Sequence, residues 1–180
     1  NEFFLADHRI DDMRVLPGVA QLEMALVAAR AATHLEGGLS LRNVVWACPA
    51  FVGNAGLEVH LALLPEQDGV IGFEIYSDVE DEVTLYSQGI VLAQTVDADA
   101  PDAVASHDLT ALREQCVLAH FEAAECYAVF EQNGLHYGPG FRGLGDVFVG
   151  EGQVLAKIQL PDPVASSLDQ FVLHPSLLDA

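Results

Sequence analysis

Residues 5–18 read Leu-Ala-Asp-His-Arg-Ile-Asp-Asp-Met-Arg-Val-Leu-Pro-Gly, and the interpretation of the whole chain starts from them. This stretch places His8 on an extended run and then opens the most apolar helix of the sequence at Pro17. Proline fits the first helical position, where its missing N–H costs nothing, and Gly18 leaves a backbone amide that a ligand can approach closely. Because free N–H groups and the positive end of the helix dipole coincide there, we expect this helix start to bind a carbonyl oxygen that gains charge.

The helix predicted from Pro17 to His34 is apolar around almost its whole circumference. Only Gln21, Glu23 and Arg30 interrupt the apolar surface. A helix of this kind is normally buried within a larger core. We therefore expect the elements that follow it to wrap around it.

Four extended runs follow the helix. Residues 57–63 alternate between apolar and other side chains, which is the period of a half-buried strand. The other predicted strands cover residues 39–51, 70–76 and 83–92, with turns at 66–69 and 78–82. One buried helix followed by about four antiparallel strands indicates an α+β fold in which a sheet covers the helix.

The second half of the chain returns to the same order of elements. Residues 95–107 are acidic, small and proline-bearing, which is typical of a linker. The predicted elements that follow are helices at 109–118 and 123–132 and a hairpin of 147–149 with 153–160. Residues 172–180 then repeat the order of residues 15–20, an extended run that meets a proline, here Pro175, and opens a helix. This order suggests a second unit of the same kind.

Composition excludes several classes of function. The chain has 180 residues, 51% of them hydrophobic, which is enough for a sizeable core. Its 27 acidic against 7 basic residues give a formal charge of −20, which argues against a nucleic-acid partner and against an anionic membrane surface. No run of 18 apolar residues occurs, and the first residues do not resemble a signal peptide, so we expect a cytoplasmic protein.

The three cysteines predict no metal site and no disulfide. Cys48, Cys116 and Cys126 are odd in number and lack a Cys-x-x-Cys spacing. Free thiols in a reducing compartment are the expectation for such a set. We predict no metal in the site.

Three motifs together resemble those of the dehydratase domains of modular polyketide synthases. His8, Asp12 and Pro17 are similar to the family signature His-x-x-x-Gly-x-x-x-x-Pro, with Asp12 in the place of the glycine. Aspartate tolerates left-handed turns better than most residues, so this departure is compatible with the fold. Residues 174–180 resemble the signature His-Pro-x-Leu-Leu-Asp-Ala, and residues 134–141 resemble the Tyr-Gly-Pro-x-Phe segment that borders the active site. The motifs stand in the family's order and at about its spacing.

The resemblance implies a double hot-dog fold, in which each unit is an antiparallel sheet wrapped around a long helix. We expect residues 1–94 to form the first unit, residues 95–133 a linker with short helices, and residues 134–180 the start of the second unit. A domain of this family continues well beyond the aspartate of the second motif. We therefore expect the second unit to be only begun, in a cropped domain.

The resemblance also implies the chemistry. His8 would be the base that removes a proton from C2 of a 3-hydroxyacyl thioester, and Asp179 the acid that protonates the departing C3 hydroxyl. An imidazole has a reference pKa of about 6.5, which suits a base, whereas a carboxyl near 3.9 must be raised by an apolar site. We expect Leu177, Leu178 and Phe141 to supply that site.

Further expectations concern the substrate and the partners. We expect the Gly18 amide to bind the thioester oxygen. Pro17, Tyr137, Gly138 and Pro139 would border the substrate, although Tyr137 equally fits a packing role and Gly138-Pro139 a simple turn. No cofactor is expected, since the substrate would travel on the phosphopantetheine of an acyl carrier protein. The other expected partners are further polyketide synthase domains and a second copy of the chain in a homodimer.

Three alternatives remain open. A relative on the same scaffold could isomerise an enoyl double bond or form a pyran ring, and a hot-dog module could serve architecture alone. Isomerising members tend to lose the second-site aspartate or the proline of the first motif, so Asp179 and Pro17 favour dehydration. Asp12 keeps the isomerase and cyclase alternatives open. We expect His174, which precedes a proline, to be structural.

Overall fold

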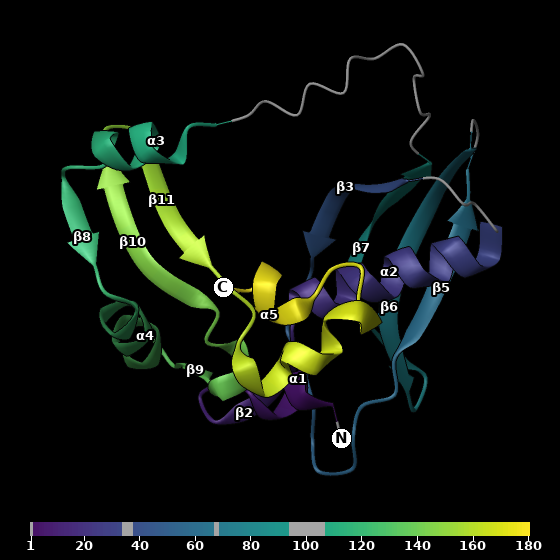
Figure 1. Ribbon diagram of the computed structural model, residues 1–180. Coiled ribbons are helices and arrows are strands. Elements are labelled where there is room, and N and C mark those ends of the chain that lie inside the picture. Colours follow the sequence, from purple (N-terminus) through teal and green to yellow (C-terminus); the bar gives the residue numbers. More distant parts are fainter. Residues whose placement is uncertain (1, 34–37, 67–68, 94–106) are drawn as a thin grey trace.

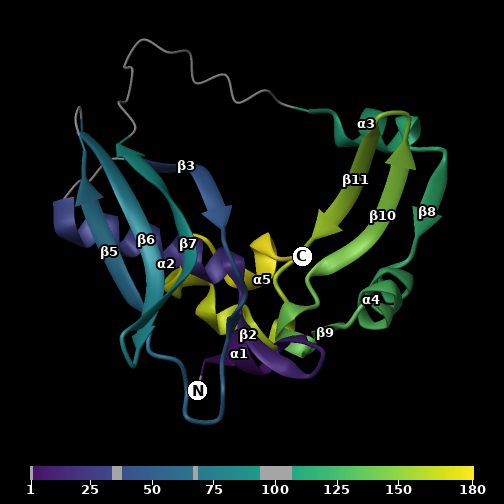
Figure 2. The same ribbon diagram turned by 180° about the vertical axis from the view of Figure 1, so that it is seen from behind.

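The computed structural model describes residues 2–33, 38–66, 69–93 and 107–180. Two groups of strands lie on opposite sides of the molecule, with the C-terminal elements between them (Figure 1). A view from behind shows the same arrangement, with the larger sheet now in front of the long helix (Figure 2). The architecture is therefore α+β, with antiparallel sheets, as the sequence predicts.

The larger sheet and its helix form the first unit. Its strand order is β3 (Leu39–Trp46), β7 (Glu82–Ala93), β6 (Val70–Val79) and β5 (His60–Pro65), and all neighbours are antiparallel. Helix α2 (Gly18–Thr33) packs against this sheet, and its Ala25 and Ala29 are completely buried in a core that includes Phe73, Ile75 and Val91. A four-stranded antiparallel sheet around one long helix is the predicted hot-dog fold.

The prediction of a helix buried on all sides is wrong for one face of α2. The side chain of Val27 is 51% exposed, and Ala31 is exposed as well. The helix contacts the strands of the larger sheet and α5 (Figure 1). The exposure of Val27 and Ala31 shows that these elements do not enclose it completely.

Two boundaries, the start of α2 and the end of β3, also differ from prediction. The helix begins at Gly18, and Pro17 precedes it, with the Pro17 carbonyl accepting the N–H groups of Ala20 and Gln21. The predicted strand 39–51 is two strands, because the chain turns after Trp46 and β4 (Ala50–Phe51) pairs with another sheet. The predicted helix end at His34, and residues 67–68 of one predicted turn, lie outside the described residues.

A second sheet carries the segment on which the sequence interpretation rests. Its strand order is β4, β2 (Met13–Leu16), β1 (His8–Ile10) and β9 (Leu135–Tyr137), and the short helix α1 (Phe3–Ala6) precedes it. Asp11 and Asp12 form the two-residue turn between β1 and β2, with φ angles of 47° and 64°. Such hairpin turns need positive φ at both positions, which explains why a glycine or an aspartate fits at residue 12.

The third sheet belongs to the second half of the chain. Its order is β11 (Gln153–Ile158), β10 (Leu144–Gly150) and β8 (Ala119–Phe121), so the predicted hairpin is confirmed and β8 is an addition. The helices of this half are α3 (Leu109–Gln115), α4 (Ala123–Gln132), η2 (Pro139–Phe141), η3 (Asp162–Gln170) and α5 (Pro175–Leu178). Helix α3 ends before the predicted Leu118, because the Leu118 amide bonds to Val149 and aligns the chain for β8. Most of the predicted linker, residues 95–106, lies outside the described residues, and the domain boundaries stay a prediction.

Candidate active site

The imidazole of His8 is held in one orientation by the hairpin that carries it. His8 is 7% exposed, and its Nδ1 lies 3.0 Å from the carbonyl oxygen of Val15 on the neighbouring strand. A carbonyl only accepts hydrogen bonds, so Nδ1 carries the hydrogen in this contact. The neutral ring then presents the lone pair of Nε2, which is the form that a general base requires.

Asp179 meets this nitrogen from the far end of the chain. Its Oδ2 lies 3.5 Å from Nε2 of His8, and the two side chains are 17% and 9% exposed. Asp179 directly follows the single turn of α5, and its amide bonds to the Pro175 carbonyl at 3.1 Å. The structure therefore brings together the base and the acid predicted from separate motifs.

The surroundings of Asp179 favour its protonated form. Burial raises the pKa of Asp179, while the neighbouring His8 and the Tyr137 hydroxyl lower it by a smaller amount. Burial also raises the pKa of Tyr137, and the negative charge of Asp179 raises it further. The buried Oδ2 of Asp179 has no hydrogen-bond partner among the described residues. A carboxyl group in such a place can serve as an acid near neutral pH.

Aromatic rings line the pair. Tyr137 stands directly opposite His8 in the register of β9 with β1, and the ring centroids of His8 and Tyr137 are 5.7 Å apart. Phe141, 1% exposed, lies at the same 5.7 Å from the His8 ring. Phe141 thus packs beside the His8 ring, and its predicted part in burying the Asp179 carboxyl stays a prediction. Leu178 is 46% exposed, so it contributes little to an apolar enclosure of the carboxyl.

The Gly138-Pro139-Gly140 segment is fixed against Asp7, the residue before His8. The Gly138 amide donates to the Asp7 carbonyl at 2.8 Å, and the Gly140 amide donates to the Asp7 carboxylate at 2.7 Å. A Cβ on Gly140 would lie 2.7 Å from that carboxylate, so the contact requires glycine. Pro139 is exposed. The structure thus gives Gly138 and Gly140 a supporting role that sequence reasoning missed, and a substrate role for Gly138 and Pro139 stays a prediction.

Gly18 lies where the predicted oxygen-binding amide should be, at the first residue of α2. Its carbonyl accepts the indole N–H of Trp46 at 3.2 Å, and a Cβ at Gly18 would lie 2.6 Å from that indole nitrogen. No described residue accepts the Gly18 amide, as expected at a helix start. Pro17 is completely buried beside it. Substrate binding by these two residues stays a prediction.

His174 supports the turn that carries Asp179. Its Nδ1 accepts the Ser176 amide at 3.2 Å as the N-cap of α5, and its Nε2 lies 3.0 Å from the Ser167 hydroxyl. Burial lowers the pKa of His174, which keeps the ring neutral and able to accept the amide. The structural role expected for His174 agrees with these contacts.

Sequence reasoning also missed Glu23, which is 7% exposed in α2 and binds the backbone just before His174. One signal was available, because an acid in a helix that is otherwise apolar must have a partner when it is buried.

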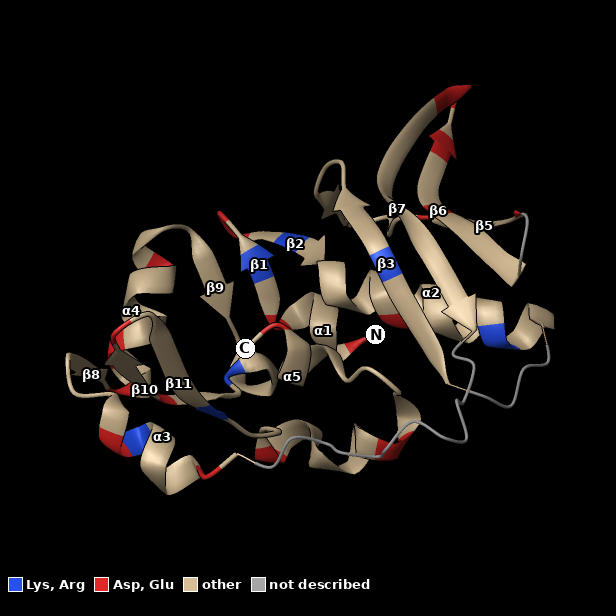
Figure 3. Cartoon of the chain, turned by 90° about the horizontal axis from the view of Figure 1, so that it is seen from above, with Lys and Arg blue, Asp and Glu red and all other residues tan. Residues whose placement is uncertain are grey.

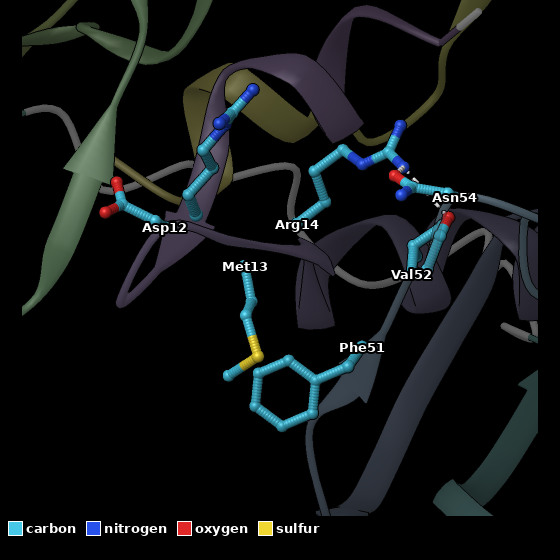
Figure 4. Close-up of a pocket in the computed structure, with 8 residues that line it drawn as sticks. Asp12, Met13, Arg14, Phe51, Val52 and Asn54 are labelled. Atoms are coloured by element: carbon cyan, nitrogen blue, oxygen red, sulfur yellow. Dashed lines mark hydrogen bonds between the residues drawn. The ribbon is translucent and has the colours of Figure 1, made fainter.

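A separate pocket lies on the other face of the β1–β2 hairpin. It has a volume of about 500 Å³, and Arg9, Arg14, Phe51 and Asn54 are among its lining residues (Figure 4). Successive residues of a strand point to opposite faces, so the side chains of Arg9 and His8 lie on opposite sides of β1, and this pocket does not include His8. Arg9 and Arg14 stand opposite each other in the register, and β1 and β2 carry neighbouring basic positions (Figure 3).

Neither a metal site nor a disulfide is found in the described part of the chain. No group of three or more metal-binding side chains occurs among the described residues. Cys48, Cys116 and Cys126 are free in the described part of the chain. None of the helices described has the length and hydropathy that crossing a membrane requires.

Comparisons with known proteins agree with this geometry. Residues 1–78 match the family model described as "Polyketide synthase dehydratase domain", and residues 81–180 match "Polyketide synthase dehydratase N-terminal domain". The polyketide synthase PksN of Bacillus subtilis is 41% identical over 99% of this chain. The chain spans only 3% of the length of that synthase.

Solved structures show the same fold. A dehydratase domain of a trans-AT polyketide synthase from Brevibacillus brevis is 41% identical, with a TM-score of 0.91 over 100% of this chain and 67% of that one. The dehydratase domain of the CurF module of the curacin polyketide synthase is 23% identical, with a TM-score of 0.87 over 99% of this chain and 63% of that one. The two family models together cover almost every residue of the chain, and it belongs to the polyketide synthase dehydratase domain family.

Proposed function

We propose that this domain removes water from a 3-hydroxyacyl thioester carried on an acyl carrier protein and forms the 2,3-enoyl thioester during polyketide elongation. The observation that carries the proposal is the 3.5 Å approach of His8 Nε2 to Asp179 Oδ2, in a site that raises the pKa of the carboxyl. A base and an acid on one face of the substrate are the two groups that this elimination needs.

The two groups divide the reaction between them. His8 Nε2 takes the proton from C2, and its Nδ1–H bond to Val15 keeps the ring in the tautomer that can do so. The electrons of the C2–H bond form the C2–C3 double bond as the C3–O bond breaks. Asp179 gives its proton to the departing oxygen, which leaves as water. The imidazolium and the carboxylate that result are adjacent, so a proton transfer between them restores the starting state.

Two further groups would stabilise the negative charges that develop in this scheme. The Gly18 amide, at the start of α2, would bind the thioester oxygen as it gains enolate character. The Tyr137 hydroxyl lies near Asp179 and, because its own pKa is raised, stays protonated and able to donate to the carboxylate that forms. Gly138 and Pro139 border the same strand end, and we propose that they shape the entry beside Tyr137.

No cofactor is needed for an elimination of this kind, and the described residues offer no metal group. The substrate would be held through the phosphopantetheine of the carrier protein. The other proposed partners are neighbouring domains of a polyketide synthase and a second copy in a homodimer. A tether within one polypeptide would offset the repulsion between this acidic chain, at −20, and an acidic carrier protein. The three free cysteines favour a reducing, cytoplasmic location.

Intact-mass measurement of the carrier protein tests the proposal. A 3-hydroxyacyl carrier protein is incubated with the full-length protein, and the loss of one water from the acyl group is the expected result. His8→Ala and Asp179→Asn variants are run beside the parent and should leave the mass unchanged.

An unchanged mass with the parent protein, for every hydroxyl stereoisomer offered, would reject dehydration. Isomerisation and ring closure do not change the mass, so chromatography of the released acyl groups would then identify either of these reactions. If neither an isomerised nor a cyclised product forms, the architectural role is the alternative that remains.

A further inference from the structure

Glu23 is the only acidic residue of α2 and is buried. Both oxygens of its carboxylate accept hydrogen bonds from a segment far away in the sequence. Its Oε1 accepts the Val172 amide at 2.9 Å, and its Oε2 accepts the Leu173 amide at 2.6 Å. Hydrogen bonds to an ionised carboxylate are short and strong, and two of them to adjacent amides fix both position and direction. The helix of the first unit thus binds the backbone of residues 172–173.

These two residues lead directly into the helical turn that ends at Asp179. Leu173 packs against the hydrophobic core of the first unit. The Phe3 ring lies 6.3 Å from the ring of Phe171 and 5.8 Å from the ring of His174, centroid to centroid. We call residues 171–174 the anchor segment. It is held by α1 on one side and by Glu23 on the other.

Burying a carboxylate is costly unless its oxygens are paired. Here both oxygens are paired, and their partners are amides for which no strand neighbour is described. The cost of burial is therefore offset only while the anchor segment stays in place. The carboxylate and the two backbone amides therefore hold each other in place.

The position of this segment decides the geometry of the active site. Only residues 175–178 separate the anchor segment from Asp179, so a shift of the anchor segment moves the Asp179 carboxyl. The distance from Asp179 Oδ2 to His8 Nε2 is 3.5 Å. A shift of about 1 Å is enough to move the Asp179 carboxyl out of reach of the C3 hydroxyl while His8 stays at C2. His8, in contrast, is fixed by its own strands.

We propose that Glu23 is a positioning residue, whose carboxylate ties α2 to the anchor segment and so holds Asp179 at His8. It acts through Asp179 and not on the substrate. This inference rests on the proposed dehydration, because it gives Glu23 a part in placing the acid of that reaction.

Glu23→Gln in the full-length protein tests the inference, with Glu58→Gln as the control. Glutamine keeps the length of the side chain but faces one of the two amides with a donor in place of an acceptor. Glu58 loses the same charge from a side chain that is 87% exposed. We expect kcat for the 3-hydroxyacyl carrier protein to fall about 10- to 100-fold in Glu23→Gln, with KM changed by about 2-fold at most. The control should match the parent.

The pH profile separates positioning from a loss of folded protein. An Asp179 that has left its buried place loses part of the elevation of its pKa, so the alkaline limb of kcat should move to lower pH in Glu23→Gln. A lower kcat with an unchanged pH profile would overturn the inference, as would a parent-like kcat. If Glu23→Gln does not fold, Glu23→Asp replaces it, because this variant keeps the charge and shortens the reach, and the same results apply.

A measurement without substrate keeps this inference distinct from the proposed function. The ¹⁵N resonance of His8 Nε2 reports the ionisation of Asp179 next to it, and we expect its titration to change in Glu23→Gln and not in Glu58→Gln. An unchanged titration would overturn the inference even in a protein that dehydrates no substrate. A parent protein without activity, combined with a changed titration, would reject the proposed dehydration alone.

Discussion

The two halves of the site are held in different ways. His8 lies in β1, between β2 and β9, and its backbone and its ring are both bonded to neighbouring strands. The segment before Asp179 is bonded to the Glu23 carboxylate, and the turn that leads to Asp179 is capped by the His174 ring. His8 is thus fixed largely by bonds to neighbouring strands, whereas the described contacts of the Asp179 segment include two buried ionisable side chains. We therefore expect the proposed acid to be displaced more easily than the proposed base.

The largest expected effect is the loss of the base. His8→Ala removes the only proton acceptor of the pair and should lower kcat/KM for dehydration by about 10⁴-fold. Because β1 keeps its backbone bonds, the thermal midpoint should fall by only a few degrees, about what the loss of one side-chain hydrogen bond contributes in a chain of this size. Steady-state rates and thermal unfolding, measured together, check both parts. Residual activity within about 10-fold of the parent would mean that another group is the base.

Replacing the acid should separate activity from stability. Asp179→Asn should lower kcat/KM about 10²- to 10⁴-fold. The pKa of Asp179 is raised by burial, so ionisation destabilises the folded parent as pH rises from the ordinary carboxyl pKa through the raised one. Asparagine does not ionise, and the variant should be more stable than the parent at pH 8 but not at pH 3. Thermal unfolding at both pH values checks this, and an equal difference at the two would contradict it.

A smaller effect is expected at the glycine that supports the base. In Gly140→Ala the new Cβ would lie 2.7 Å from the Asp7 carboxylate and 3.0 Å from Val164, and it should lower the free energy of unfolding by about 1–3 kcal/mol. Gly53→Ala is the control, because a Cβ there meets nothing within 4 Å. Denaturant unfolding of both variants is the measurement. Equal stability of the two would show that the contact of Gly140 with Asp7 is not needed.

The smallest expected effect concerns the cap of the acid half. The pKa of His174 is lowered by burial, so the stability that its neutral ring provides is complete above the ordinary histidine pKa and is lost as pH falls from there to the lowered value. His174→Asn keeps an acceptor for the Ser176 amide and cannot gain a proton. Between pH 7 and pH 5 we expect the parent to lose about 0.5–2 kcal/mol more stability than the variant. Denaturant unfolding at the two pH values is the measurement. An equal loss of stability in the parent and in His174→Asn would contradict this role.

Much of the first unit follows from local sequence patterns. The apolar run after Pro17 defined α2 to within about a residue at its start, and the period-two alternation of residues 57–63 indicated β5, which begins at His60. These signals are short-range, because helix and strand periodicity depend on residues close in the sequence. The same patterns placed β4 in the wrong strand, since its partner, β2, lies far from it along the chain.

By itself, the sequence predicted the hot-dog helix and its sheet and, through three motifs, the pairing of His8 with Asp179. The two-residue turn at Asp11 and Asp12 emerged only from the structure. Only the tertiary structure decided that these two side chains approach to 3.5 Å, and that Glu23 is committed to the backbone before α5. The reason is physical. Periodicity and turn chemistry are written in neighbouring residues, whereas the meeting of residues far apart in the chain depends on how whole elements pack.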